Sequence, residues 1–291
     1  MKAFASIISG IGGALAATTA YAQDAIYVSQ PEDWGWWHME PGSAMMRDIE
    51  WFDAYTFWFI TPITIFVMLL LLWVIIRFNS KANPTASKTS HNTTIEFVWT
   101  VAPIIVLIAI AVPSFQLLDE QLAPTEEPTL TVKANGLQWY WSYEYQDDSE
   151  ISFDSLMLQE DDREEAGKTD KQVYPRLLAV DNELVVPVNE MIRVLVTADA
   201  DGVIHDWAVP AFGIKIDAIP GRVNETWFKA EKEGLYYGQC SELCGKDHAF
   251  MPIAIRVVDR DTFEAWQDAA LDDVDGANKA FFLAKNEDKN T

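Results

Sequence analysis

The chain has 291 residues, and its 44 acidic residues outnumber 21 basic residues, which gives a formal charge of −23. A charge this negative excludes tight binding to nucleic acid, because the phosphate backbone would be repelled rather than neutralised. Two cysteines are too few for a disulfide-rich domain, a cysteine-rich zinc fold or an iron–sulfur cluster with four thiolates. The mean hydropathy of −0.01 hides two long apolar runs in an acidic remainder.

Residues 1–22 have the pattern of a cleaved secretory signal peptide. A basic start and a short apolar run precede Ala20-Tyr21-Ala22, which forms an Ala-x-Ala cleavage site. The run is too short to span a bilayer, so we expect cleavage before Gln23. Residues 23–53 would then form an N-terminal segment outside the cytoplasm, in a compartment where disulfides can form.

Two uncharged apolar runs predict a membrane hairpin. Each run is long enough to cross a bilayer as a helix, so we predict spans at residues 54–76 and 96–118 joined by a loop at 77–95. The loop contains basic residues and no acid, whereas both outer flanks are acidic. The positive-inside rule therefore places the loop in the cytoplasm and both flanks outside, in agreement with the signal peptide. Tryptophans typical of interface anchors lie near the span ends: Trp51, Trp58, Trp73 and Trp99.

Glu96 lies at the cytoplasmic end of the second predicted span. A carboxylate in this position is either an ordinary interfacial charge or part of a proton entry path. The spacing alone favours the ordinary charge.

Residues 119–260 change from apolar runs to short alternating segments, which predicts a β-sandwich. Many short strands separated by Gly, Pro, Asn and Asp are typical of an antiparallel sandwich. Residues 159–169 are densely acidic and predict a solvated surface insertion. Residues 261–291 predict a helix laid on the domain, followed by a tail. The predicted strands are residues 129–134, 138–145, 183–188, 191–196, 203–209, 225–229, 234–239 and 253–258.

The densest chemistry lies within twelve residues near the end of the domain, where two thiols, an imidazole and a thioether occur together. A second imidazole, His205, belongs to an earlier predicted strand. Soft thiolate and thioether donors with imidazole favour copper over hard cations such as Mg²⁺. The donors in the short segment are Cys240, Cys244, His248 and Met251.

Four interpretations of these donors remain open. A Cys240–Cys244 disulfide would leave His248 and Met251 without a role. Tetrahedral zinc can take two cysteines and two histidines, but Met251 would then be idle. A mononuclear blue-copper site needs only one cysteine, so the second cysteine does not fit that pattern. Two thiolates that bridge two coppers, each capped by one imidazole and one weaker ligand, use the donor set with little left over.

The segment Cys-Ser-Glu-Leu-Cys-Gly-x-x-His-x-x-Met-Pro at residues 240–252, with His205, resembles the dinuclear copper A motif of cytochrome c oxidase subunit 2. The aromatic run at 138–145 and residues 216–222 resemble other regions of that family, so the likeness covers nearly the whole mature chain. It implies a two-helix transmembrane hairpin followed by an all-β, cupredoxin-like Greek-key sandwich with a C-terminal helix. The signal peptide and the acidic insertion resemble bacterial members.

The resemblance also implies a ligand set. Two cysteines would bridge two copper ions, one histidine would bind each ion, and a thioether and a backbone carbonyl would complete the two coordination spheres. The implied copper ligands are His205, Cys240, the Glu242 carbonyl, Cys244, His248 and Met251. The Glu242 carboxylate would face a magnesium or manganese ion shared with subunit 1.

The same resemblance also implies which residues take part in electron and proton transfer. Trp139 would be the electron entry point, and Glu96 would belong to the proton path, which reverses the preference from spacing alone. Cytochrome c, soluble or membrane-anchored, would dock on an acidic face. The implied docking acids are Glu144, Asp147, Asp148, Glu150 and Asp181.

The function implied is electron entry into a haem–copper oxidase of the bacterial inner membrane, with both termini in the periplasm. Electrons from cytochrome c would pass to haem in subunit 1, where dioxygen is reduced to water with proton translocation, and subunit 3 is a further expected partner. The absence of Cys-x-x-Cys-His excludes a fused haem c domain. Leu137 and Asp206 depart from the family pattern without removing a ligand. The alternatives are a metal-free quinol oxidase subunit and a membrane-tethered copper-delivery protein.

Overall fold

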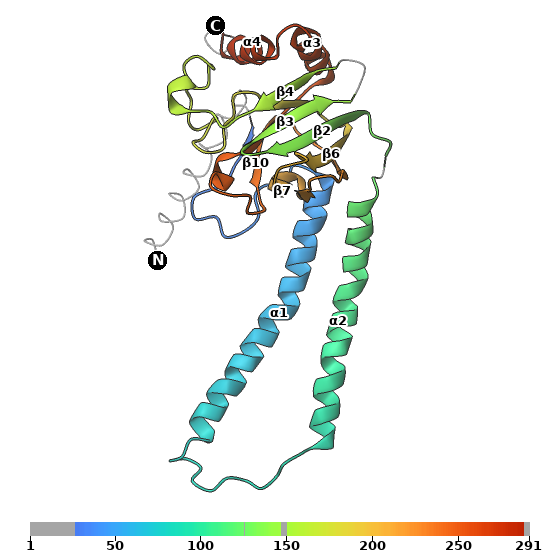
Figure 1. Ribbon diagram of the computed structural model, residues 1–291. Coiled ribbons are helices and arrows are strands. Elements are labelled where there is room, and N and C mark those ends of the chain that lie inside the picture. The colour runs from blue at the N-terminus through green and yellow to red at the C-terminus, as the bar shows by residue number, and fades with distance from the viewer. Residues whose placement is uncertain (1–26, 125, 147–149, 288–291) are drawn as a thin grey trace, which may run out of the picture.

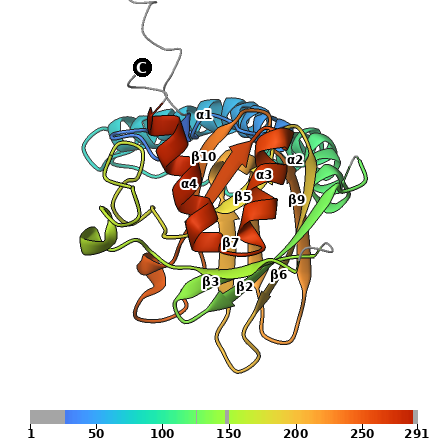
Figure 2. The same cartoon turned by 90° about the horizontal axis from the view of Figure 1, so that it is seen from above.

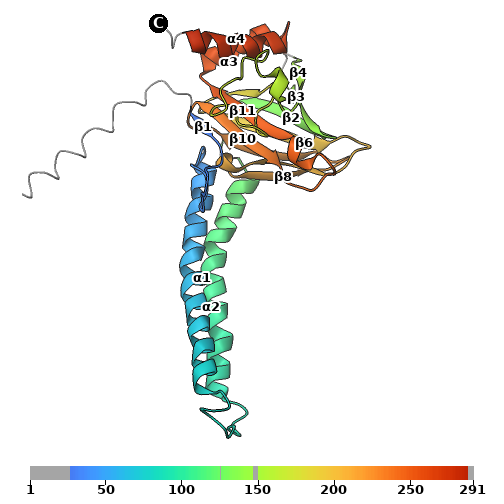
Figure 3. The same ribbon diagram turned by 90° about the vertical axis from the view of Figure 1, so that its left-hand side faces the viewer.

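The structure is a computed structural model that describes residues 27–124, 126–146 and 150–287, with the side chains of 281–287 excepted. Two long helices, α1 (Ala44–Arg77) and α2 (Thr93–Leu122), extend side by side from a β-sandwich and are joined at their far ends (Figures 1 and 3). Both helices are long and apolar enough to cross a membrane. The predicted signal peptide at 1–22 lies outside the described residues.

Both helices begin at a side-chain cap. The Ser43 hydroxyl accepts a hydrogen bond from Met46 N, and the Asn92 side chain accepts one from Ile95 N. The helices are longer than the predicted spans, because helical hydrogen bonding continues through the polar residues that flank each apolar run. The extra turns at the start of α1 carry that helix up to the sandwich, where the Ser43 hydroxyl also donates to Phe212 O at 3.0 Å.

The sandwich consists of two sheets, and each predicted strand is present. One sheet has the order β5-β11-β10-β7-β8 with β1 beside β10, and the other has the order β4-β3-β2-β6-β9. The first sheet contains β1 (Val28–Ser29), β5 (Leu184–Pro187), β7 (His205–Val209), β8 (Ile214–Ala218), β10 (Gly234–Cys240) and β11 (Pro252–Val258). The second contains β2 (Leu130–Leu137), β3 (Tyr140–Tyr145), β4 (Ser152–Ser155), β6 (Met191–Ala198) and β9 (Asn224–Lys229).

The sheets are mixed, so the expectation of an antiparallel sandwich is wrong in part. β2 pairs with β6 in parallel, and β11 pairs with β5 in parallel. Each parallel pair is separated in sequence by several other strands, as a parallel crossover requires. Local alternation identifies a strand and its buried face, but it contains no information about the direction of a partner so distant in the chain.

The core lies between the sheets and under the C-terminal helices. Alternate residues of β2 are buried, whereas every residue of β11 is buried, because Tyr174 and Val180 of the segment before β5 pack against Ala254 on the second face of that strand. Figure 2 shows the C-terminal helices lying across the sandwich in the view from above. The predicted single C-terminal helix is two helices, α3 (Arg260–Ala270) and α4 (Val274–Glu287), with a turn at 271–273 between them. Trp266 of α3 is fully buried, and its indole donates to Asn278 Oδ1 of α4 at 2.9 Å.

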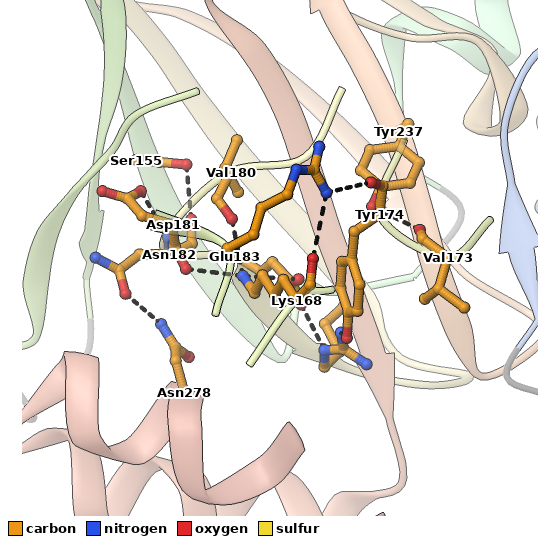
Figure 4. A network of polar contacts seen from close by, with 12 residues as sticks. Ser155, Lys168, Val173, Tyr174, Val180, Asp181, Asn182, Glu183, Tyr237 and Asn278 are labelled. Carbon is orange, nitrogen blue, oxygen red and sulfur yellow. Dashed lines mark hydrogen bonds and ion pairs between the residues drawn. The ribbon is translucent and has the colours of Figure 1, made fainter. Parts of the chain in front are cut away.

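The acidic insertion is not simply a solvated loop, because its basic residues are buried in the domain (Figure 4). The Lys168 ammonium donates to the carbonyls of Val180 and Asp181, both at 2.8 Å, and lies 3.1 Å from Glu183 Oε1. Arg256 of β11 donates to the other oxygen of Glu183. The acidic pattern of the segment therefore describes its exposed side, while its lysine enters the core to pair with a buried carboxylate.

Replacing Glu183 with glutamine should destabilise the domain by about 3–5 kcal/mol, because Lys168 and Arg256 would remain buried without their counter-charge. Urea unfolding of the full chain in detergent, followed by tryptophan fluorescence, measures this loss. Glu164→Gln changes an exposed acid of the same insertion and is the matched control, for which we expect an unchanged midpoint. Equal midpoints for the two variants would contradict the role given to Glu183.

Candidate metal centre

The pairing of β7 with β10 assembles the candidate ligands. β10 ends at Cys240, which lies opposite Trp207 of the antiparallel strand β7. His205 is the first residue of β7, so this register carries its imidazole to the end of β10. The loop after Cys240 continues through Cys244 to a short helix, η4 (His248–Phe250). Met251 follows that helix and directly precedes β11.

The side chains form a compact, two-ended cluster. The sulfur atoms of Cys240 and Cys244 lie 3.8 Å apart. The His205 Nδ1 atom is 3.9 Å from the Cys240 sulfur, and the His248 Nδ1 atom is 3.5 Å from the Cys244 sulfur. The Met251 sulfur is 3.6 Å from the Cys244 sulfur, and the Glu242 carbonyl oxygen is 3.4 Å from the Cys240 sulfur. Each thiol therefore has its own imidazole and its own weaker donor.

The sulfur separation distinguishes between the chemistries that the sequence left open. Both cysteines are free thiols, and 3.8 Å is far beyond the length of a disulfide bond. Two thiolates that bind one ion at about 2.3 Å with a tetrahedral angle lie about 3.8 Å apart, so the spacing suits a shared metal. The nitrogen and sulfur atoms of His205, Cys240 and Cys244 all lie within 4.8 Å of one another.

Burial makes this cluster costly without a metal. His205 is fully buried, and its Nε2 atom has no hydrogen-bond partner among the described residues, while its Nδ1 atom faces only a sulfur. A buried polar group without a partner costs about 1–3 kcal/mol. Cys240, Cys244 and Met251 are also buried. Soft sulfur donors with imidazole nitrogens match the preference of copper, so the residues present fit a copper centre.

Burial favours the neutral forms of two of the donors, Cys244 and His205. Burial, followed by the neighbouring Cys240, raises the pKa of the Cys244 thiol to about 12. Burial, followed by repulsion from His248, lowers the pKa of the His205 imidazole. The imidazole is thus available as a neutral donor at pH 7, whereas metal binding must displace the proton of the Cys244 thiol.

Two tryptophans of the aromatic run fix the ligand loop. The half-buried Trp139 donates its indole N–H to Cys244 O at 3.1 Å, and the fully buried Trp141 donates to Met251 O at 3.3 Å. Gly245 has φ +131°, and a side chain there would come within 2.8 Å of the Trp139 ring. Glycine is therefore required both by the backbone conformation and by the ring.

Some residues of the site were not predicted from sequence. A Cβ atom at Gly136 of β2 would lie 3.0 Å from the His205 ring, so this glycine leaves room for the ligand. Lys246 lies over Trp139, with its ammonium nitrogen 5.3 Å from the ring centroid. The alternation of the aromatic run places Trp141 on the buried face. Only the packing of the two sheets against each other shows that Trp141 contacts the ligand loop.

A cleft of about 550 Å³ opens beside Trp139. Residues 156–159, which lead into the insertion, form one wall and the metal loop forms the other, so the cleft brings solvent to the edge of the ligand cluster. Its lining residues are Gln138, Trp139, Tyr140, Leu156, Met157, Gln159, Lys246, Asp247 and Phe250.

The other predicted site residues lie apart from the cluster. Glu96 is in the first turn of α2, and its carboxylate accepts a hydrogen bond from Asn92 N at 3.2 Å, which is a helix-capping contact. Glu242 has an exposed side chain. Its carboxylate therefore faces away from the buried sulfur atoms that its carbonyl accompanies.

The predicted docking acids have differing surroundings. Glu144 is exposed and lies 3.2 Å from the Lys133 ammonium, and hydrogen bonds from Gln146 and Lys133 lower its pKa. Glu150 is exposed. Asp181 accepts hydrogen bonds from Leu156 N and Asn182 N, and burial raises its pKa. Asp147 and Asp148 lie outside the described residues.

Two protein families match the two parts of the chain. Residues 130–258 match the family described as cytochrome c oxidase subunit II, periplasmic domain, and residues 31–117 match the family described as cytochrome c oxidase subunit II, transmembrane domain. A probable cytochrome c oxidase subunit 2 from Rickettsia bellii (strain RML369-C) is 47% identical over 240 residues, 82% of this chain and 86% of the relative.

Longer similarity is found to the cytochrome c oxidase subunit 2 of Cereibacter sphaeroides, which is 43% identical over 276 residues, 90% of this chain and 89% of that protein. The crystal structure of the periplasmic domain of subunit II of cytochrome oxidase from Bradyrhizobium japonicum is 58% identical, with a TM-score of 0.45, and covers 51% of this chain and 98% of its own. The family models match both the hairpin and the sandwich, and the two relatives at 47% and 43% identity cover 82% and 90% of the chain. The chain therefore belongs to the cytochrome c oxidase subunit 2 family.

Proposed function

We propose that the chain is the electron-entry subunit of a haem–copper oxidase, and that it takes electrons from cytochrome c and passes them to haem in subunit 1. The observation that carries this proposal is the pair of thiols 3.8 Å apart, each approached by its own imidazole. Two coppers held by such a pair would supply a one-electron carrier. A subunit that binds no metal would not require this set of donors. The arrangement therefore disfavours the alternative of a metal-free quinol oxidase subunit.

In this proposal the two cysteines would both hold the pair of copper ions, and the remaining donors would divide between the ions. Cys240 lies nearest to His205 and the Glu242 carbonyl, while Cys244 lies nearest to His248 and Met251. The buried strand ends and the two indole hydrogen bonds hold these donors in place. A rigid frame keeps the donor positions similar in both oxidation states, which suits rapid electron transfer.

Trp139 is the proposed entry residue, because it joins the cleft to the ligand loop. Trp139 lines the cleft, and its indole N–H donates to the carbonyl of Cys244. The acidic face around Glu144 and Glu150 would attract a basic cytochrome c. Asp181 is engaged by two backbone N–H groups, so its contribution to docking would be the field of its charge rather than a direct contact.

Several further assignments belong to the same proposal. The exposed Glu242 carboxylate would bind a magnesium or manganese ion shared with subunit 1, and Glu96 would admit protons at the cytoplasmic membrane surface. Dioxygen reduction and the main part of proton translocation would take place in subunit 1, with subunit 3 as a further neighbour. The sandwich and both termini would lie in the periplasm.

Electron paramagnetic resonance of the copper-loaded full chain tests the dinuclear centre. We expect a hyperfine pattern from one electron shared equally by two coppers, and we expect Cys244→Ser to abolish that pattern because one bridging thiolate is lost. Leu243→Ala is the matched control, since Leu243 lies between the two cysteines with its side chain exposed to solvent. A single-copper pattern in the unaltered chain would refute the proposal.

Copper binding should strengthen as the pH rises. The raised pKa of Cys244 keeps the thiol protonated at neutral pH, so each displaced thiol proton makes affinity rise by about tenfold per pH unit. Competition with a chelator between about pH 6 and pH 8 measures the slope, and the released protons can be counted in weakly buffered solution. An affinity that does not change with pH would contradict the assignment of thiolate ligands.

Electron entry from a basic cytochrome c should slow by about ten- to a thousandfold as ionic strength rises from low to high, because salt screens the acidic face. Stopped-flow reduction of the assembled oxidase measures the bimolecular rate.

Glu144→Gln should flatten the dependence of this rate on salt. Trp139→Phe, which loses the N–H contact to Cys244 O, should lower the rate at every ionic strength with the slope unchanged. Identical salt slopes for Glu144→Gln and the unaltered chain would remove Glu144 from the docking face.

A further inference from the structure

An aromatic loop precedes α1 and takes no part in the metal centre. Three tryptophans occur within four residues, Trp34, Trp36 and Trp37, and the first two have 99% and 83% of their surface exposed. Gly35 N donates to Glu32 O at 3.1 Å, which closes a turn with Trp34 at its tip. Exposed aromatic side chains gathered in this way mark a surface that contacts another phase or molecule.

The loop is fastened to one face of α1. The Trp37 indole donates to Glu50 Oε1 at 2.9 Å, and His38 Nε2 lies 3.2 Å from Asp53 Oδ2. The Trp37 ring meets the Phe57 ring edge-on, with centroids 6.2 Å apart. Glu50, Asp53 and Phe57 are three and four residues apart, so they lie along one side of the helix.

This attachment fixes the depth of the loop relative to the membrane. Phe57 lies inside the uncharged run that begins at Ala54, about 5 Å further along the helix axis at 1.5 Å per residue. Figure 1 shows the blue segment before α1 on the membrane side of the sandwich, level with the first turns of α1. Trp37 is therefore held where the hydrocarbon of the bilayer begins, and Trp34 and Trp36 are held beside it.

The chemistry of the loop fits the headgroup region of a bilayer. Indole rings are amphipathic, with an apolar body and an N–H donor, and they concentrate at membrane–water interfaces. Trp51 and Trp58, on the adjoining part of α1, are also exposed, so the loop extends an aromatic surface that the membrane helix itself begins. Glu32 and Asp33 of the turn are exposed and can remain in the headgroup water.

We propose that the loop Trp34–His38 is an interfacial membrane anchor, which inserts Trp34 and Trp36 among the lipid headgroups of the outer leaflet beside α1. The anchor adds a third point of attachment to those of the two spans. It would thereby limit rocking of the sandwich, and with it the distance between the metal centre and the neighbouring subunit. The attraction comes from indole rings rather than charge, so it should be insensitive to salt.

Photocrosslinking in the assembled oxidase, reconstituted in lipid nanodiscs, tests this proposal. A photoreactive benzoylphenylalanine replaces Trp34 or Trp36, and mass spectrometry identifies the adducts after irradiation. Leu271 is the matched control position, because it is exposed but lies between α3 and α4, at the opposite end of the molecule from the membrane hairpin. We expect several-fold more lipid adducts at both loop positions than at position 271, at low and high salt alike.

Adducts to another oxidase subunit at both positions would overturn the proposal and make this surface a protein interface. Lipid adducts no more frequent than at position 271 would equally overturn it, because the loop would then face water. An unchanged optical spectrum of each variant confirms that assembly is intact. As an independent measurement, lipids brominated near the headgroup end of the acyl chain should quench more fluorescence of the unaltered chain than of a Trp34→Phe, Trp36→Phe double variant.

Discussion

Cys240 and Cys244 hold their sulfur atoms 3.8 Å apart without forming a bond, and much of the domain can be understood as the frame that maintains this spacing. One thiol ends a central strand, and the other is in a loop whose carbonyls accept hydrogen bonds from two tryptophans of the opposite sheet. The sandwich therefore positions the ligands from both of its layers. Because closely packed interiors resist small displacements, such a frame keeps the donors fixed.

A buried charge of the insertion stabilises the same domain at a distance from the ligand cluster. Lys168 and Arg256 converge on Glu183, so the insertion is attached to β11 through the carboxylate that directly precedes β5. Gln159 at the start of the insertion lines the cleft beside Trp139, together with Leu156 and Met157 just before it. An ion cluster remote from the candidate metal centre thus holds the segment that continues from one wall of the cleft through which electrons are proposed to enter.

The hairpin and the sandwich are joined by more than a linker. Ser43 caps α1 and also contacts Phe212 O, while Arg47 pairs with Glu231 at the base of the domain. Phe212 in turn stacks on Phe228 with ring centroids 4.5 Å apart, so the start of the helix reaches the aromatic core. The membrane and the metal centre are therefore connected through packed elements, and the aromatic loop at Trp34–His38 lies at this junction.

Most of the architecture could be predicted from the sequence, because its signals are local. Apolar length identifies a membrane helix, alternation identifies a strand, and the spacing of two cysteines, a histidine and a methionine predicts a soft-metal site within one loop. The prediction of a two-helix hairpin and a β-sandwich with C-terminal helical structure is confirmed. Two features that were not predicted are non-local: the parallel pairing of β2 with β6 and the burial of Lys168 within an acidic segment. The short break between α3 and α4 was also not predicted.

The sequence by itself determined which donors are available, because the side chains that bind soft metals are a short and recognisable set. The tertiary structure alone decided how they are arranged. His205 is 35 residues from Cys240 in the chain, and only the register of β7 against β10 brings its imidazole to the sulfur. The space for that ring is left by Gly136, from the other sheet. Contacts between distant segments depend on the packing of the whole domain, and no local pattern records them.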